Sequence, residues 1–207
     1  MQVDLTGPAG RLEGLYEEPA SASFSAVVCH PHPLFGGTLH NHATYRLAKA
    51  VRETGGASLR FNFRGVGRSQ GSHSEGRGEP DDVRAALAWL AVRRPDLPRY
   101  ACGFSFGAWM ALIAGCPEPE VRGILAAGLA PRSLDLDFLR RCPKPVAAVQ
   151  AENDQYGSVE QIQALLSGSA HPRRLAVVPK ATHLFTEDLP ALQREAAVAL
   201  AWLRESN

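Results

Sequence analysis

The sequence predicts an α/β fold built on one doubly wound, mostly parallel sheet with helices on both faces. Short, continuous apolar runs, such as residues 24–29 and 57–63, have the composition of strands that are buried on both faces. Segments with helical spacing of apolar residues alternate with these runs, which is typical of right-handed β-α-β crossovers. At 207 residues with 45% hydrophobic residues, the chain is long enough for one domain, and we expect that domain to span residues 1–207.

The expected strands are apolar runs bounded by turn residues. The first two, at residues 2–6 and 11–17, are separated by Gly7-Pro8-Ala9-Gly10, which is a hairpin-type break. The run at residues 24–29 is the first strand expected to be buried. The later strands are expected at residues 57–63, at residues 99–104 just before Ser105, and at residues 121–130, 146–150 and 174–178.

The expected helices have apolar residues three or four positions apart. Glu79, Asp81 and Asp82 open one of them, where their charges suit the helix dipole, and we favour this structural role over catalysis. Ser158 and Gln161 have the spacing of a capping box at the start of another. Helical spacing is found within residues 43–51, 83–90, 106–113, 159–166 and 189–203.

The most informative motif is Gly103-x-Ser105-x-Gly107, at the point where a predicted strand turns into a helix. A turn this tight forces Ser105 towards a positive φ, and a side chain at either glycine position would collide with the turn. The turn would lift the serine hydroxyl off the sheet, beside the first N–H groups of the helix. A purely structural strand-to-helix turn can have the same spacing. We interpret the motif as a nucleophile beside an anion-binding site.

The partners that a serine nucleophile needs are found farther along the chain. A serine hydroxyl requires an imidazole to take its proton and a carboxylate to orient that imidazole. Asp154 and His183 each follow a predicted strand, and active groups collect at the carboxyl ends of parallel strands. We therefore predict Ser105, Asp154 and His183 as the catalytic residues. Asp135 and Asp137 are the rival acids, and Asp154 is favoured because it directly follows a well-formed apolar strand.

An oxyanion site requires two backbone N–H donors. The N–H of Phe106 is one candidate, because it directly follows Ser105 in the turn. The second is expected in the loop after residues 24–29, where Pro31 and Pro33 have no N–H to donate. This leaves His32 or Leu34, and we favour His32 because it lies nearer the end of the strand.

Five segments together resemble a known family: His30-Pro31, residues 64–69, residues 103–107, Asp154 and His183. The chain is similar to α/β-hydrolases, in particular to the small lidless serine hydrolases of the dienelactone-hydrolase-like branch. The resemblance extends over residues 2–203 and implies a sheet of about eight strands with an antiparallel second strand. The superfamily usually inserts its cap domain where this chain has residues 131–145, a segment that can hold one short helix near 136–141. Dienelactone hydrolases themselves use a cysteine at the position of Ser105.

Without a lid, we expect an open cleft that is suited to a small acyl group. Five apolar residues are predicted to line it: Leu34, Phe35, Phe104, Leu129 and Leu184. Three basic residues are candidates to rim the cleft and to bind a substrate carboxylate: Arg64, Arg68 and Arg132. For these arginines, a role in surface solubility is the favoured alternative.

Composition argues against several other classes of protein. The net charge of +1 favours neither nucleic acid nor an acidic membrane as a partner. The N-terminal residues resemble no signal peptide and no apolar run is long enough to span a membrane, so we expect a cytoplasmic protein. The cysteines lack C-x-x-C spacing, and buried reduced thiols are favoured over a disulfide framework. The four cysteines are Cys29, Cys102, Cys116 and Cys142.

Neither a metal nor a cofactor is expected. Histidines cluster next to Cys29 at positions 30, 32, 40 and 42, but no carboxylate or second histidine pair follows at a familiar ligand spacing. Residues 65–67 begin a G-x-G pattern, but Gln70 replaces the glycine that a dinucleotide site would need.

The sequence therefore predicts a serine hydrolase that cleaves a small ester or thioester through an acyl-enzyme. The alternative is a catalytically silent binding module that keeps the hydrolase fold. The presence of Ser105, Asp154 and His183 together argues against that alternative. The expected partner is a small-molecule ester. The sequence leaves the oligomeric state open, with a homodimer as one candidate.

Overall fold

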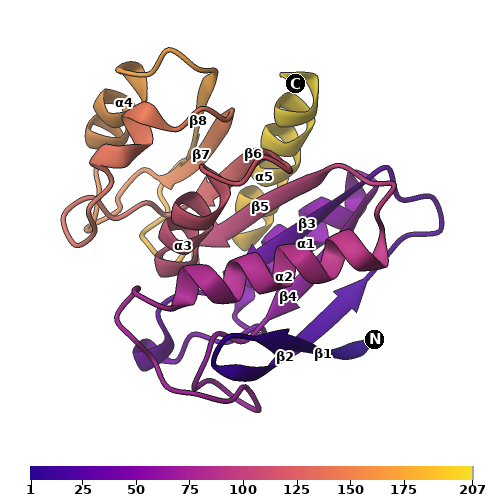
Figure 1. Cartoon of the computed structure of the whole chain (residues 1–207). Helices are drawn as coiled ribbons and strands as arrows, with labels where there is room; N and C mark the ends of the chain where they lie inside the picture. The colour runs from indigo at the N-terminus through magenta and orange to yellow at the C-terminus, as the bar shows by residue number, and fades with distance from the viewer. Residues whose placement is uncertain (207) are drawn as a thin grey trace.

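Eight strands form one sheet in the computed structural model, which describes residues 1–206 (Figure 1). Strands β3, β4 and β5 are buried along their whole length, as continuous apolar runs predict. In chain order the strands are β1 (Gln2–Gly7), β2 (Gly10–Glu17), β3 (Phe24–Cys29), β4 (Gly56–Phe61), β5 (Arg99–Phe104), β6 (Val121–Ala127), β7 (Val146–Ala151) and β8 (Arg173–Val178).

The order of the strands across the sheet is β1-β2-β4-β3-β5-β6-β7-β8. β2 pairs antiparallel with both of its neighbours, whereas the strands from β4 to β8 pair in parallel. The predicted sheet of about eight strands with an antiparallel second strand is thus confirmed. Because β3, β5, β7 and β8 are parallel, the loops that follow them emerge at the same side of the sheet.

Helices cover both faces of the sheet (Figure 1). Side chains of α2, α3 and α4 form one hydrophobic core with the sheet, and those of α1 and α5 form the other. This arrangement is the predicted doubly wound architecture. The α-helices are α1 (His42–Glu53), α2 (Glu79–Arg93), α3 (Phe106–Gly115), α4 (Val159–Ser167) and α5 (Leu189–Glu205), and two short 3-10 helices are η1 (Pro33–Phe35) and η2 (Asp137–Arg141).

Local signals in the sequence explain several element ends. Ser158 Oγ accepts the N–H of Gln161, and the side chain of Gln161 accepts the N–H of Ser158, so the predicted capping box is present. β6 ends at Ala127, earlier than the predicted Ala130. The reason is Gly128, whose φ of +60° turns the chain away from the sheet.

The connection between β6 and β7 is short. Within residues 1–206, the one regular element that it contains is η2. The predicted absence of a cap domain is therefore confirmed, and the carboxyl end of β5 is not covered by an inserted domain.

The prediction of four reduced thiols is wrong for two of the cysteines. Cys116 and Cys142 form a disulfide, with Cα atoms 5.2 Å apart across a sequence separation of 26. The fold brings the end of α3 against the end of η2, a proximity that the spacing of cysteines in the sequence does not reveal. Cys29 and Cys102 are free and buried, as predicted. Burial raises the pKa of Cys102 to about 12 and the pKa of Cys29 well above its ordinary value, so neither thiol is a reactive nucleophile at neutral pH.

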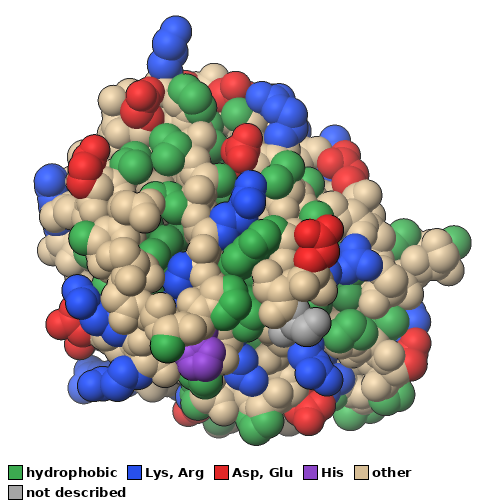
Figure 2. Space-filling model, turned by 90° about the horizontal axis from the view of Figure 1, so that it is seen from above, with side chains coloured by type: hydrophobic (Ala, Val, Ile, Leu, Met, Phe, Trp, Pro, Cys, Tyr) green, Lys and Arg blue, Asp and Glu red, His purple; other side chains and the backbone are tan. Residues whose placement is uncertain are grey.

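Basic and acidic side chains are interspersed on the face shown in Figure 2, where hydrophobic side chains lie between them. This distribution agrees with the small net charge of the chain. Among the described residues, no helix combines the length and the apolar composition needed to cross a bilayer.

Candidate active site

Ser105 lies at a strained turn between β5 and α3. Its φ is +56° and its ψ is −119°, so the backbone has the positive φ that the motif predicts. A Cβ added at Gly103 would lie 2.2 Å from the carbonyl oxygen of Gly107, and one added at Gly107 would lie 2.4 Å from the carbonyl oxygen of His30. Both contacts are with backbone atoms, which cannot move aside as a flexible side chain can. The two flanking glycines are thus required by the close approach of three chain segments.

Three side chains from distant parts of the sequence form a continuous hydrogen-bonded series. Ser105 Oγ lies 2.9 Å from His183 Nε2, and His183 Nδ1 lies 2.8 Å from Asp154 Oδ2. A carboxylate can only accept, so Nδ1 of the neutral imidazole carries the proton and Nε2 is left to accept from the serine hydroxyl. An imidazole held in this way can remove the proton of the hydroxyl as that oxygen attacks an electrophile.

The carboxylate of Asp154 is held in place by two further donors. Its Oδ1 accepts the N–H of Tyr156 at 2.9 Å, and its Oδ2 lies 2.9 Å from Nε2 of Gln150. Gln150 is buried at the end of β7, and its amide also bonds the backbone N–H and carbonyl of Leu129. Sequence reasoning did not identify Gln150 as part of the site. A buried amide at the end of an apolar strand is a signal that could have identified it.

The two predicted oxyanion donors, the backbone N–H groups of Phe106 and His32, belong to residues that line the same hollow as Ser105. His30 fixes the peptide that carries the N–H of His32. Its Nδ1 lies 2.6 Å from the carbonyl oxygen of Pro31, and its Nε2 accepts the N–H of Phe63 at 3.1 Å. Because the peptide between Pro31 and His32 is trans, its N–H points away from the carbonyl that His30 holds.

The side chain of His30 is fully buried, and this burial lowers its pKa to about 4. At neutral pH the ring is therefore neutral, with Nδ1 as the donor and Nε2 as the acceptor. This assignment matches both of its partners, a carbonyl and an N–H group.

The hollow at Ser105 has a volume of about 390 Å³ and is lined mainly by apolar surface. Of the five apolar residues predicted to line it, Phe35, Phe104 and Leu184 do so. Phe35 is 87% exposed, which places its ring at the rim. The hollow also has lining residues that were not predicted: Pro31, Asn41, Ala130, Ser133, Leu134, Gln155 and Tyr156.

The structure corrects the other two predicted lining residues. Leu129 is completely buried in the core on the side of α2, α3 and α4, because its backbone is bonded to the side chain of Gln150. Leu34 is 70% exposed and lies outside the hollow, because η1 directs it to solvent while Phe35 turns to the site.

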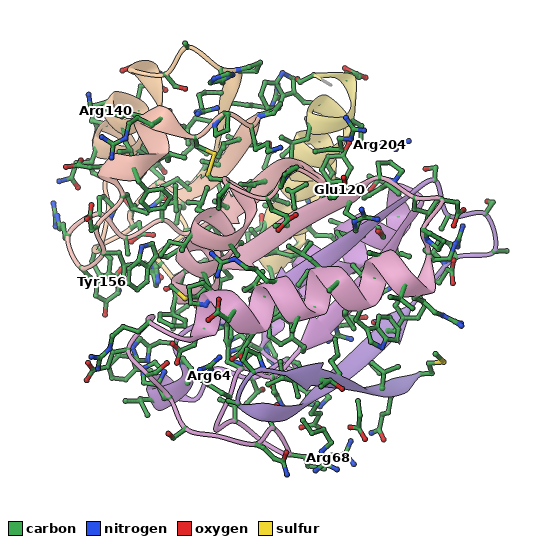
Figure 3. The ribbon with its side chains drawn as sticks, in the orientation of Figure 1. Arg64, Arg68, Glu120, Arg140, Tyr156 and Arg204 are labelled. Atoms are coloured by element: carbon green, nitrogen blue, oxygen red, sulfur yellow. A yellow bond between two sulfur atoms is a disulfide. The ribbon has the colours of Figure 1, made fainter. Side chains whose placement is uncertain are left out.

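None of the three candidate arginines lines the hollow. Arg64 forms a two-pronged ion pair with the buried Asp82, with 2.7 Å between Nη2 and Oδ1, and these hydrogen bonds raise the pKa of Arg64. Arg68 pairs with Glu13 and lies at the outer edge of the molecule, away from Tyr156 (Figure 3). Arg132 donates to the carbonyl of Gln155 at 3.0 Å. Each of these arginines is therefore engaged in a contact within the chain, and carboxylate binding by them, which the sequence did not favour, stays a hypothesis.

Glu79, Asp81 and Asp82 lie in the first turn of α2, the position predicted for them, and two of them also hold neighbouring segments. Asp82 anchors Arg64, as described above. Glu79 is fully buried and accepts the N–H and the hydroxyl of Ser74 and the N–H of Gly76. It therefore fixes the loop that leads into the helix.

Comparisons with known proteins agree with this fold. The family model described as the dienelactone hydrolase family matches residues 70–207. An uncharacterized protein from Rickettsia prowazekii is 38% identical over 171 residues, which are 80% of this chain and 72% of that protein. An alpha-beta serine hydrolase homologue from Coxiella burnetii has 32% identity and a TM-score of 0.90, with 97% of each chain covered. A serine hydrolase without a lid from Xanthomonas campestris has 29% identity and a TM-score of 0.89, over 98% of this chain and 94% of that one.

Proposed function

The chain belongs to the dienelactone hydrolase family and has the lidless α/β-hydrolase fold, and from this premise we propose that it is a serine hydrolase that cleaves small carboxylic esters or thioesters through an acyl-enzyme. The observation that carries the proposal is the hydrogen-bonded series from Ser105 through His183 to Asp154 at the strained turn after β5. Strain of this kind costs on the order of 1–3 kcal/mol and is found mainly where it serves a function.

In the first half of the reaction, Ser105 Oγ attacks the carbonyl carbon of the substrate while His183 Nε2 takes the hydroxyl proton. The backbone N–H groups of Phe106 and His32 bind the negative oxygen of the tetrahedral intermediate. When this intermediate collapses, the bond from carbon to the leaving oxygen or sulfur breaks and His183 returns the proton to the leaving group. The acyl group then remains as an ester on Ser105.

In the second half, a water molecule attacks the acyl carbon and gives its proton to His183 Nε2. The bond between the acyl carbon and Ser105 Oγ breaks, and the serine oxygen recovers its proton from His183. The carboxylic acid leaves and the enzyme is restored. Throughout the cycle, Asp154 stabilises the charged form of His183 and keeps the proton on Nδ1.

Two features support a small substrate. The hollow at Ser105, of about 390 Å³, is at the low end of the range for small-molecule sites. Its apolar lining, with Phe104 at the base and Phe35 and Leu184 at the rim, suits a short hydrocarbon chain or a ring.

Steady-state hydrolysis of p-nitrophenyl acetate tests the proposal. We expect Ser105→Ala to lower kcat by about 10⁴-fold or more while the variant keeps the unfolding midpoint of the wild type. Ser167→Ala is the matched control, because Ser167 lies on α4, outside the lining of the hollow, and its hydroxyl bonds the carbonyl of Ala164. A loss of only a few-fold in Ser105→Ala would contradict the proposal.

A further inference from the structure

The hollow at Ser105 continues into two others. We call them the reaction hollow, which contains Ser105 and His183, the middle hollow, and the distal hollow. Asn41, Phe104 and Leu184 line both the reaction hollow and the middle hollow. His40 and His42 line both the middle hollow and the distal hollow. The three hollows therefore adjoin one another in a row from Ser105 past the N-terminal end of α1, and we call this row the groove.

The groove ends among basic side chains. Arg46 and Arg60 line the distal hollow together with His40 and His42, and no Asp or Glu belongs to the described lining of either the middle or the distal hollow. Thr186 lines the middle hollow and Leu189 lines the distal hollow, and the two acids between them in sequence are Glu187 and Asp188. Both have partners elsewhere, since Glu187 binds Thr182 and Asp188 caps α5.

The positive charge in the distal hollow is only partly neutralised. Arg60 is 4% exposed and shares the carboxylate of Glu17 with Arg52, so that two guanidinium groups face one carboxylate. Nη1 of Arg60 donates to the carbonyl of Leu39 at 3.0 Å, Nη2 donates to Glu17, and Nε is buried, so Arg60 contributes charge to the hollow and no free donor. The ring of Tyr45 lies 5.4 Å from the guanidinium of Arg60 and helps to fix it.

Arg46 is the residue that can reach a ligand most readily. It is half-buried on α1, and its side chain donates to Oε1 of Gln193, a neutral partner. It lies five residues after Asn41, so the helical rise places it about 7 Å farther along the axis of α1. A guanidinium in such a position suits a carboxylate or a phosphate, because its planar fork matches the oxygens of either group.

The direction of the groove indicates which part of a substrate it would hold. His183 delivers the proton to the leaving group, so the leaving group departs on the side of His183. Leu184, the next residue, is one of the walls shared by the reaction and middle hollows. The alcohol or thiol part of the substrate is therefore directed along the groove, towards Arg46 and Arg60.

We propose that the enzyme prefers esters or thioesters whose leaving group ends in an oxyanion, either a carboxylate or a phosphate, which binds to Arg46 in the distal hollow, beside the buried charge of Arg60. This inference rests on the hydrolase function proposed above and adds a class of substrate to it. The anion would anchor the leaving group through charge-assisted hydrogen bonds. Its contribution would therefore be found mainly in KM.

Acetyl thioesters of thiols of graded length test the proposal, with each thiol ending in a carboxylate, a phosphate or a methyl ester. Release of the free thiol is followed by its reaction with a chromogenic disulfide. At the length that spans the groove, we expect kcat/KM for an anionic thioester to exceed that of its methyl ester by about tenfold or more. The carboxylate and phosphate arms identify which oxyanion the site prefers.

Three variants of α1 assign the effect to the distal hollow. Arg46→Gln should remove the preference for the anionic thioesters and leave hydrolysis of the methyl esters unchanged. Arg46→Lys should keep part of the preference, because the charge remains without the planar fork. Lys49→Gln is the matched control: Lys49 lies on the same helix, pairs with Glu53 and lines none of the three hollows, so its variant should behave as the wild type.

Equal kcat/KM for anionic and neutral thioesters at every length would overturn the inference, and so would a preference that survives in Arg46→Gln. Failure of the proposed function would give a different result: the wild type and Ser105→Ala would then hydrolyse every thioester at the same rate.

Discussion

The buried ring of His30 should make this protein less stable as the pH falls. His30 is fully buried, and both of its ring nitrogens bond backbone groups. Burial lowers its pKa from 6.5 to about 4, so the folded state binds fewer protons than the unfolded state between these two values. The contribution of the neutral ring to stability is therefore complete above pH 6.5 and is lost as the pH falls towards 4. A pKa difference of this size between the folded and unfolded states changes the free energy of unfolding by about 3 kcal/mol.

Urea unfolding of the wild type and of His30→Gln, measured at intervals from pH 7 down to pH 4, tests this reasoning. Carboxylates also titrate in this range, but they are common to both proteins, so the difference between the two curves isolates His30. We expect the free energy of unfolding of the wild type to fall by about 3 kcal/mol more than that of the variant. If the free energies of unfolding of the two proteins fall in parallel as the pH decreases, the assignment of a strongly lowered pKa to His30 is refuted.

A direct titration of the His30 ring by NMR in the folded wild type gives a second measurement that does not depend on the stability of the variant. We expect the ring resonances to remain those of the neutral form down to about pH 5. A midpoint near 6.5 would contradict the account.

Three further outcomes follow from the structure. Asp154→Asn should lower kcat by about 10⁴-fold by favouring the wrong tautomer of the catalytic imidazole, whereas Asp135→Asn should be neutral, as ester hydrolysis assays would show. Gly107→Ala should destabilise the fold, because the new Cβ would lie 2.4 Å from a backbone oxygen; a circular-dichroism melt equal to the wild type would contradict this steric argument. Replacement of Cys116 and Cys142 by serine should lower the free energy of unfolding by about 3–4 kcal/mol, measured by urea titration under non-reducing conditions.

The parts of the site that depend on local sequence could be predicted. The turn at Ser105 is specified by two glycines within a few residues, and the structure has the positive φ and the close backbone contacts that this spacing implies. Asp154 and His183 were identifiable because the carboxyl ends of parallel strands meet at one side of the sheet. The structure places these two side chains within hydrogen-bond distance of each other, and His183 within hydrogen-bond distance of Ser105.

The parts that depend on packing could not be predicted. Leu129 follows an apolar strand just as a lining residue would, and only the bonds to Gln150 show that it is turned into the core. The disulfide between Cys116 and Cys142 joins the end of α3 to the end of η2, which only the packing of these elements brings together. Arg64 had the position of a rim residue, but its buried partner Asp82 is contributed by the next helix.

The most direct test of the proposed mechanism is the identification of the residue that a fluorophosphonate modifies in the native protein. We expect one adduct, located at Ser105 by peptide mass spectrometry, and its loss in His183→Ala because the hydroxyl would no longer have a base within 2.9 Å. An unmodified Ser105 in the folded wild type would contradict the mechanism and would favour a silent binding module with the same fold.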